Sequence, residues 1–428
     1  MFETAVFPRL CSRASPSLRV PPKEREKAET FFRMEESRSD ALSRDSAPDS
    51  AVVFTSSSSA FASFVPSTDL ALKIGEAAAR HFGAVRSDGT KAHVVIGRDT
   101  RISGEFLEHA LAAGLASAGM DVTLLGVVTT PTVAYLTASQ DDIDLGVMIS
   151  ASHNPMPDNG IKFFAHGGYK LPDAVEDEIE ALLGTEWERP TGDGVGEVDE
   201  QHEKAKRLYV DHLVKSVNTD LKGLTIIVDC ANGAAFELGP LALREAGAEV
   251  IVINAEPDGR NINLNAGSTH PEGLQKAVVE HKADFGVAYD GDADRCLAVD
   301  AEGNLIDGDK IMGALAVDAR ERGKLKGDTL VVTVMSNLGL ILAMRDKGIK
   351  TVQTAVGDRY VLEEMRASDY VLGGEQSGHI IDLDHATTGD GILSSLLVAR
   401  MVKESGRSLA DLTAFVERLP QTLINVGG

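Results

Sequence analysis

Cysteine is scarce in the 428-residue sequence, which contains only Cys11, Cys230 and Cys296. These three residues lie far apart and form no CxxC pair. Structural zinc sites and disulfide frameworks need several cysteines at short spacings, so the sequence argues against both. The pattern fits a reducing compartment, and we expect the protein in the cytoplasm.

Positive charge and long apolar segments are also scarce. Lys and Arg number 42 against 65 Asp and Glu, which gives a net charge of −23. Such a surface repels nucleic acids and anionic membranes, so we expect neither as a partner, while local basic sites for anionic substrates stay compatible with it. No apolar run is long enough to span a bilayer, and the N-terminus lacks the apolar core of a signal peptide.

Hydrophobic residues make up 43% of the chain, and a typical domain size of ~150 residues gives about three domains. Short apolar runs alternate with segments of helical periodicity, which is typical of βαβ units. We therefore predict three consecutive α/β modules with mixed, largely parallel sheets. The predicted strands cover residues 93–97, 122–125, 145–149, 226–229, 250–254, 285–289, 329–334, 350–354 and 370–372. The predicted helices are one that Thr68 caps and Gly83 closes, 103–119 with Phe106 on its apolar side, 337–347 and 358–367.

Composition gives the expected domain boundaries. The N-terminal residues mix Arg, Glu, Ser and Pro without sustained periodicity, so we expect a disordered tail or a misread start of the chain. A charged stretch and a turn, at 186–206 and 300–304, divide the remainder. The expected segments are a tail at 1–65, modules at 66–196, 197–301 and 302–415, and a short final stub at 416–428.

A loop rich in serine and asparagine follows the predicted strand 145–149. The loop begins at Ser150, and Pro155 with the turn residues 157–160 bends the chain before the next strand starts at Ile161. A hydroxyl at such a strand end is expected to be exposed and rigidly placed, as a nucleophile or phosphate acceptor requires. The alternative is a turn that only satisfies its own backbone.

Three aspartates at alternate positions, Asp290, Asp292 and Asp294, follow the apolar strand 285–289. In an extended chain alternate side chains point to one side, so the carboxylates should converge. Their repulsion requires a cation, and hard oxygen ligands favour Mg²⁺ or Ca²⁺. An EF-hand is excluded, because the glycine and glutamate that it needs at its sixth and twelfth positions are arginine and alanine here. An aspartyl phosphatase and a solvated acidic turn are the remaining alternatives.

A third candidate loop reads GGEQSGH at residues 373–379. Its glycines permit close approach of the backbone to a ligand. Glu375 and Ser377 can each hydrogen-bond a sugar hydroxyl, and His379 is either a proton shuttle or a structural histidine. This loop alone is weak evidence for a site.

Together these loops resemble the α-D-phosphohexomutase family, through ASHNP at 151–155, DGDADR at 290–295 and GEQSGH at 374–379. The resemblance covers about residues 66–428. The stretches DNGIKFF, VGDRYV and TTGDG are most similar to the glucosamine-specific members of the family. The resemblance implies an isomerase whose partners are a hexosamine phosphate substrate, glucosamine 6-phosphate or glucosamine 1-phosphate, and a bisphosphorylated intermediate. A phosphomannomutase or phosphoglucomutase is the alternative within the family.

The resemblance also implies roles for individual residues. Ser152 would carry a phosphate, and Mg²⁺ would bind Asp290, Asp292, Asp294 and the phosphate on Ser152. Proton transfer is implied for Lys162 and His379, and contact with the transferring phosphate for Arg295. Substrate contacts are implied for Glu375, Ser377, Asp358, Arg359 and His153, whereas Arg98 and Arg101 lie in matching segments without an assigned role.

Two segments depart from the family pattern. The family has a G-T-[SD]-G-[IV]-R-G loop before its first helix, where this sequence reads SSSSAFASF. The family also has a fourth domain with an RPSGTEP-like phosphate-binding loop, and this domain would begin where the sequence stops. From these departures we expect poor turnover of glucosamine phosphate, and a catalytically weakened binding or assembly module is a further alternative.

Overall fold

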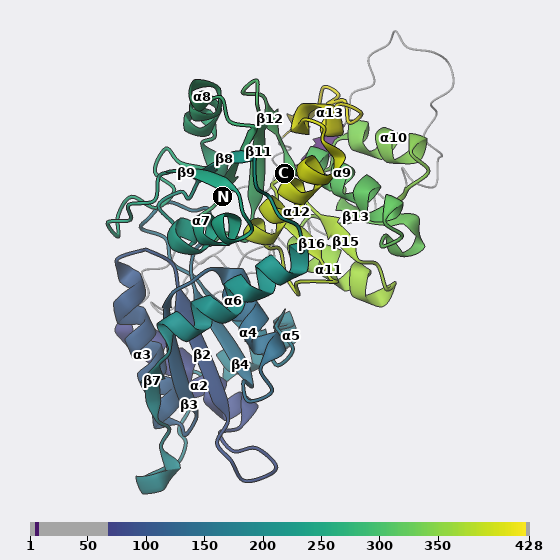
Figure 1. Ribbon diagram of the computed structural model, residues 1–428. Coiled ribbons are helices and arrows are strands. Elements are labelled where there is room, and N and C mark those ends of the chain that lie inside the picture. Colours follow the sequence, from purple (N-terminus) through teal and green to yellow (C-terminus); the bar gives the residue numbers. More distant parts are fainter. Residues whose placement is uncertain (1–4, 8–66, 425–428) are drawn as a thin grey trace. The chain divides into compact units, whose positions relative to one another are not determined.

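The computed structural model describes residues 5–7 and 67–424 (Figure 1). Most of the predicted tail and residues 425–428 lie outside the described residues. Within the predicted tail, Ala5–Phe7 forms strand β1, which pairs antiparallel with β17 (Thr422–Ile424). These two strands belong to one compact unit, and the elements from α2 to α13 belong to a second, residues 53–417.

The first module of the larger unit is a six-stranded sheet in the order β6-β5-β4-β2-β3-β7. Strands β2, β3, β4 and β7 are parallel, and β5 and β6 continue the sheet antiparallel. The strands are β2 (His93–Arg98), β3 (Asp121–Val127), β4 (Leu145–Ile149), β5 (Ile161–Ala165), β6 (Tyr169–Lys170) and β7 (Val198–Glu200). The helices are α2 (Thr68–Phe82), α3 (Ser103–Ser117), α4 (Thr130–Ser139) and α5 (Asp173–Ala181), and a short 3-10 turn, η2, covers Gly192–Gly194.

The second module has a five-stranded sheet in the order β12-β11-β10-β8-β9. Its strands are β8 (Thr225–Asp229), β9 (Glu249–Ile253), β10 (Phe285–Tyr289), β11 (Cys296–Asp300) and β12 (Leu305–Ile306). Its helical segments are α6 (His202–Val217), which leads in from the first module, α7 (Ala235–Glu245), η3 (Gly267–Thr269) and α8 (Glu272–His281).

The third module has a four-stranded sheet in the order β14-β13-β15-β16. Its strands are β13 (Thr329–Thr333), β14 (Lys350–Thr354), β15 (Leu372–Gly374) and β16 (Ile380–Asp382). Its helical segments are α9 (Gly308–Glu321), η4 (Lys326–Asp328), α10 (Leu338–Asp346), α11 (Asp358–Ala367), α12 (Gly391–Ser405) and α13 (Leu409–Thr413).

The three sheets share one plan, with parallel strands in the centre and antiparallel strands at one edge. The prediction of α/β modules with mixed, largely parallel sheets is therefore confirmed. In each sheet a loop joins the last parallel strand to its first antiparallel neighbour, β4 to β5, β10 to β11 and β15 to β16. These three loops contain the serine, aspartate and GEQSGH motifs, so the same position in the fold supplies each candidate site segment.

The central strands are buried on both faces, which is why they read as continuous apolar runs. On β2, Val94 and Ile96 pack into one hydrophobic cluster and Val95 packs into another on the opposite face. This alternation follows from the two-residue period of a strand. The described residues contain no helix that is long and apolar enough to cross a membrane.

Some predicted details are wrong. Helix α2 is capped by Ser67, whose hydroxyl accepts a hydrogen bond from the Leu70 amide at 3.3 Å, so Thr68 is the first helical residue. Phe106, predicted on the apolar side of α3, is 46% exposed, because the buried stripe of that helix is centred on Leu107 and Leu111. The last strand of the third module's parallel set begins two residues later than predicted.

Candidate active site

Ser152 lies in the loop after β4, and its hydroxyl donates a hydrogen bond to Asp290 Oδ2 at 2.6 Å. The Ser152 backbone is left-handed, with φ of 50°. The hydroxyl was expected to be exposed, but Ser152 is only 3% exposed. The correction has a simple cause, because an approaching loop from another module covers the end of β4.

A buried ion pair supports the serine loop from below. Arg101 and Asp99 pair through their side chains, and Asp99 Oδ2 accepts the Ser150 hydroxyl at 2.6 Å. The Ser150 oxygen in turn accepts the Ser152 amide at 2.9 Å. Arg101 also donates to the Asn154 carbonyl at 2.7 Å. This chain of bonds fixes the left-handed turn that presents the Ser152 hydroxyl.

The second module holds the same loop from the other side. Asn263 Nδ2 donates to the Ser152 carbonyl at 2.8 Å and to the Asn154 carbonyl at 3.1 Å. Gly291 permits this close approach, since a Cβ there would lie 2.5 Å from the Ser152 carbonyl oxygen. The serine and aspartate loops are therefore built as one unit, although about 140 residues separate them.

The three aspartates converge as predicted, but for a different reason. Asp290, Asp292 and Asp294 each offer an oxygen, and the three atoms lie within 4.8 Å of one another. The segment is a turn rather than extended chain, with Ala293 at φ of 59°. The turn, not the alternation of a strand, brings the carboxylates to one point.

The chemistry of this cluster fits a divalent cation. Asp292 Oδ1 and Asp294 Oδ1 are buried and have no hydrogen-bond partner among the described residues. Burial and the repulsion of the other two carboxylates raise the pKa of Asp290. Burial also opposes ionisation of Asp294, but Lys162 and His379 outweigh it and lower the pKa of that carboxyl. Buried oxygens that accept no hydrogen bond and lie among like charges are what a metal ion would satisfy.

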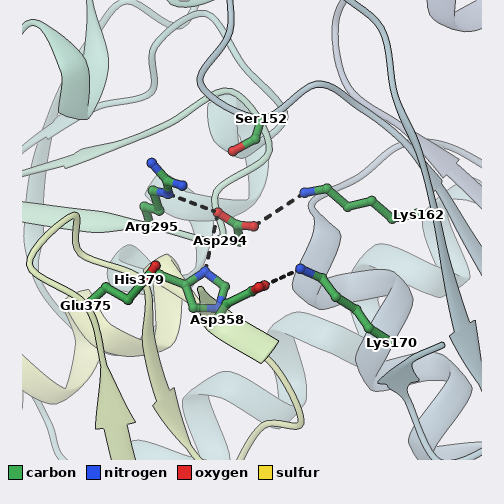
Figure 2. A pocket seen from close by; sticks show the side chains of 8 residues that line it. All are labelled: Ser152, Lys162, Lys170, Asp294, Arg295, Asp358, Glu375 and His379. Carbon is green, nitrogen blue, oxygen red and sulfur yellow. Dashed lines mark hydrogen bonds and ion pairs between the residues drawn. The ribbon is translucent and has the colours of Figure 1, made fainter. Parts of the chain in front are cut away.

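Cationic side chains surround the carboxylates, as Figure 2 shows for Asp294. Lys162, on β5, contacts Asp292 Oδ2 at 2.6 Å and Asp294 Oδ2 at 3.4 Å. Arg295 Nε lies 3.9 Å from Asp294 Oδ1, and His379 Nδ1 lies 3.7 Å from the same oxygen. All three modules thus place charged side chains around Asp294, and His379 is the one from the third module.

The GEQSGH loop contains two further polar side chains, of which Glu375 lines the cavity. Glu375 Oε1 accepts the Gly357 amide at 3.0 Å, which fixes the side chain. Ser377 Oγ is buried without a hydrogen-bond partner in the described part of the chain. Gly378, with φ of 92°, lets the loop approach the second module, because a Cβ there would lie 2.4 Å from the Cys296 carbonyl oxygen.

A small cavity lies among these groups (Figure 2). The residues that line it are Ser152, Lys162, Lys170, Asp294, Arg295, Asp358, Glu375 and His379. All except Lys170 were predicted as site residues. Lys170 lies on the two-residue strand β6 and pairs with Asp358, and no motif in the sequence marks it.

Three predicted substrate residues, Ser377, Arg359 and His153, are not among the residues that line the cavity. Arg359 pairs with Asp173 and with Glu363 at 2.8 Å, and it lines a wider groove beside α5 and α11. His153 Nδ1 lies 3.5 Å from the Ser152 hydroxyl. Burial and the nearby Arg295 charge lower the pKa of His153 to about 4, so this imidazole is neutral at pH 7.

The fold and the cavity define a class of protein. A buried serine hydroxyl lies beside a candidate metal centre, and cationic side chains from all three modules lie around them. This arrangement is typical of an enzyme that transfers phosphoryl groups. Sequence models of the phosphoglucomutase/phosphomannomutase alpha/beta/alpha domains I, II and III match residues 62–189, 207–303 and 307–419. The chain belongs to this phosphoglucomutase/phosphomannomutase family, which confirms the resemblance to the phosphohexomutases.

Individual relatives agree with the family match. Phosphoglucosamine mutase of Bifidobacterium animalis subsp. lactis is 60% identical over 363 residues, which cover 83% of this chain and 80% of the relative. Phosphoglucosamine mutase of Saccharopolyspora erythraea is 59% identical over 358 residues, 84% of this chain and 80% of the relative. The crystal structure of a putative phosphomannomutase from Thermus thermophilus aligns with a TM-score of 0.71 at 26% identity, covering 82% of this chain and 79% of that one.

Proposed function

We propose that the chain is a phosphoglucosamine mutase, an isomerase that interconverts glucosamine 6-phosphate and glucosamine 1-phosphate. The observation that carries the proposal is the Ser152 hydroxyl, held 2.6 Å from one of three clustered carboxylates inside a polar cavity. The substrate is inferred from relatives named phosphoglucosamine mutase at 59–60% identity. The free thiols of Cys230 and Cys296 support a cytoplasmic site of action.

The proposed reaction transfers a phosphoryl group twice. In the first transfer the O–P bond of phospho-Ser152 breaks and a bond forms to the free sugar hydroxyl oxygen, whose proton passes to a basic side chain of the cavity, while Ser152 Oγ takes up a proton. The product is a sugar bisphosphate and unmodified Ser152. In the second transfer the bond between the other phosphoryl group and the sugar breaks and a bond to Ser152 Oγ forms; the Ser152 hydroxyl gives up its proton, and the sugar oxygen that is left takes one up. The net change is an isomerisation, with no phosphate gained or lost.

Residues of the cavity fit the separate needs of this reaction. Asp290, Asp292 and Asp294 would hold Mg²⁺, which supplies positive charge against the phosphate. Lys162 and His379 are the proposed groups for proton transfer, because both line the cavity beside Ser152. Burial of the Ser152 side chain supports transfer to a sugar rather than to water.

The GEQSGH loop is proposed to bind the sugar. Ser377 Oγ is a buried polar atom without a hydrogen-bond partner in the structure as described, so a sugar hydroxyl would satisfy it. Glu375 is held by the Gly357 amide through one oxygen only, and its other oxygen can accept a hydroxyl. Asp358 lines the cavity together with Glu375 and is the third proposed contact.

Phosphorylation of Ser152 tests the proposal. The purified chain is incubated with glucosamine 1,6-bisphosphate and Mg²⁺, and its intact mass is measured. We expect one added phosphate in the wild type and in Ser216→Ala, a control serine on α6, and none in Ser152→Ala. Phosphate that persists in Ser152→Ala would overturn the assignment. Comparing conversion of glucosamine, mannose and glucose phosphates then tests the substrate, and a preference for mannose 6-phosphate would favour the alternative phosphomannomutase function.

A further inference from the structure

Thr130 of the first module is bonded directly to the candidate metal loop of the second. Its hydroxyl donates to Asp292 Oδ2 at 2.5 Å, and its backbone amide donates to the Asp292 carbonyl at 3.0 Å. Both residues are fully buried. The two bonds join positions that lie 162 residues apart in the sequence, so they fix the aspartate loop against the start of α4.

The hydroxyl of Thr130 is not needed to begin the helix. Thr129 is the N-cap of α4, and its hydroxyl accepts the Thr132 amide at 3.3 Å. Pro131 occupies the first turn, where a missing amide donor costs nothing. The Thr130 side chain is therefore available for a contact outside the helix, and Asp292 receives it.

The two carboxylate oxygens of Asp292 differ in their hydrogen bonding. Oδ2 accepts hydrogen bonds from Thr130 and from Lys162 at 2.6 Å. Oδ1 is buried and has no hydrogen-bond partner among the described residues. A carboxylate with one oxygen occupied by donors presents the other as a single ligand atom, whereas an unrestrained carboxylate can rotate and bind a cation through both.

We propose that Thr130 is a positioning residue of the metal centre, which holds Asp292 so that only Oδ1 reaches the cation. The proposal rests on the metal centre of the proposed function. It assigns Thr130 two effects, on affinity and on the choice of cation. Single-oxygen ligation suits the small octahedral Mg²⁺, while the larger Ca²⁺ accepts bidentate carboxylates.

The test compares Thr130→Val, which removes the hydroxyl at nearly constant volume, with Thr130→Ser, which keeps it. Thr137→Val is the matched control, because Thr137 is a buried threonine of the same helix whose hydroxyl, among the described residues, bonds only to the Val133 carbonyl. Binding of Mn²⁺ to the substrate-free protein is measured by the electron paramagnetic resonance of the free ion, with competition by Mg²⁺ and Ca²⁺. Circular dichroism melting accompanies each variant.

We expect Thr130→Val to raise the Kd for Mn²⁺ by about 10- to 100-fold, which is the usual effect of losing a partner of a metal ligand. The ratio of Mg²⁺ to Ca²⁺ affinity should fall in the same variant, while Thr130→Ser and Thr137→Val should stay near wild type. Unchanged affinity and selectivity in Thr130→Val would overturn the role of Thr130 alone. A wild type that binds no divalent ion, or an Asp292→Asn variant that binds as well as wild type, would instead overturn the metal centre itself.

Discussion

Asp99 and Arg101 help to fix the conformation of the Ser152 loop, although neither lines the cavity. Their side chains are both about 1% exposed, and the ion pair connects through Ser150 to the backbone of Ser152. Because both side chains are buried, water cannot hydrate either charge when its partner is lost. At the scale of single residues, the geometry of the Ser152 loop therefore depends on an ion pair outside the three sequence motifs.

Arg101→Met should lower the free energy of unfolding by about 3–5 kcal/mol, because it leaves the Asp99 carboxylate buried and unpaired. Burial already raises the pKa of Asp99, and loss of Arg101 removes the charge that opposes this shift. Urea unfolding at pH 7 measures the change. The double variant Asp99→Asn/Arg101→Met should lose less than the sum of the two single variants. Simple additivity would contradict the ion-pair account.

Helix α12 begins at a buried carboxylate that links two modules. Asp390 accepts the Leu393 amide at 2.9 Å as the N-cap of α12, and it accepts the Tyr209 hydroxyl of α6 at 2.9 Å. Burial raises the pKa of Asp390 from 3.8 to about 6. At the scale of elements, the start of α12 thus combines a cap, an inter-module bond and a charge that is costly to bury.

The raised pKa predicts a specific pH dependence. The folded state favours protonated Asp390, so its contribution to stability is complete below pH 4 and is lost as the pH rises through about 6. Two pKa units correspond to about 3 kcal/mol. Asp390→Asn keeps acceptor capacity but cannot titrate, so its stability relative to wild type should increase by roughly that amount from pH 4 to pH 7. Chemical denaturation of both proteins across this range provides the measurement, and parallel stability curves would contradict the prediction.

At the scale of the whole molecule, some structural features could be predicted from local sequence patterns. Buried central strands such as β4 and β10 appear as continuous apolar runs, so their positions and the α/β class could be predicted. The three motif loops follow equivalent strands of their sheets, and their order in the sequence already placed them in three modules. No local sequence pattern predicts a contact between modules. That the three loops meet at one cavity could therefore be inferred only from the family resemblance.

The remaining features depend on contacts between distant segments. Burial of Ser152 arises from a loop about 140 residues away, and Thr130 and Lys170 contact acidic partners in other modules. Nothing in the local sequence of these residues marks such contacts. The aspartate cluster was predicted correctly on an incorrect argument, since the left-handed Ala293 and not strand alternation brings the carboxylates together.

A single-turnover experiment tests whether Ser152 passes its phosphate to a sugar, as proposed. The chain, labelled with radioactive phosphate on Ser152 and freed of excess donor, is mixed with glucosamine 6-phosphate and Mg²⁺, and the products are separated after quenching. We expect the label to move to the sugar, as glucosamine bisphosphate and then monophosphate, and a chelator to prevent the transfer. Label that stays on the protein, or that appears directly as inorganic phosphate, would contradict it.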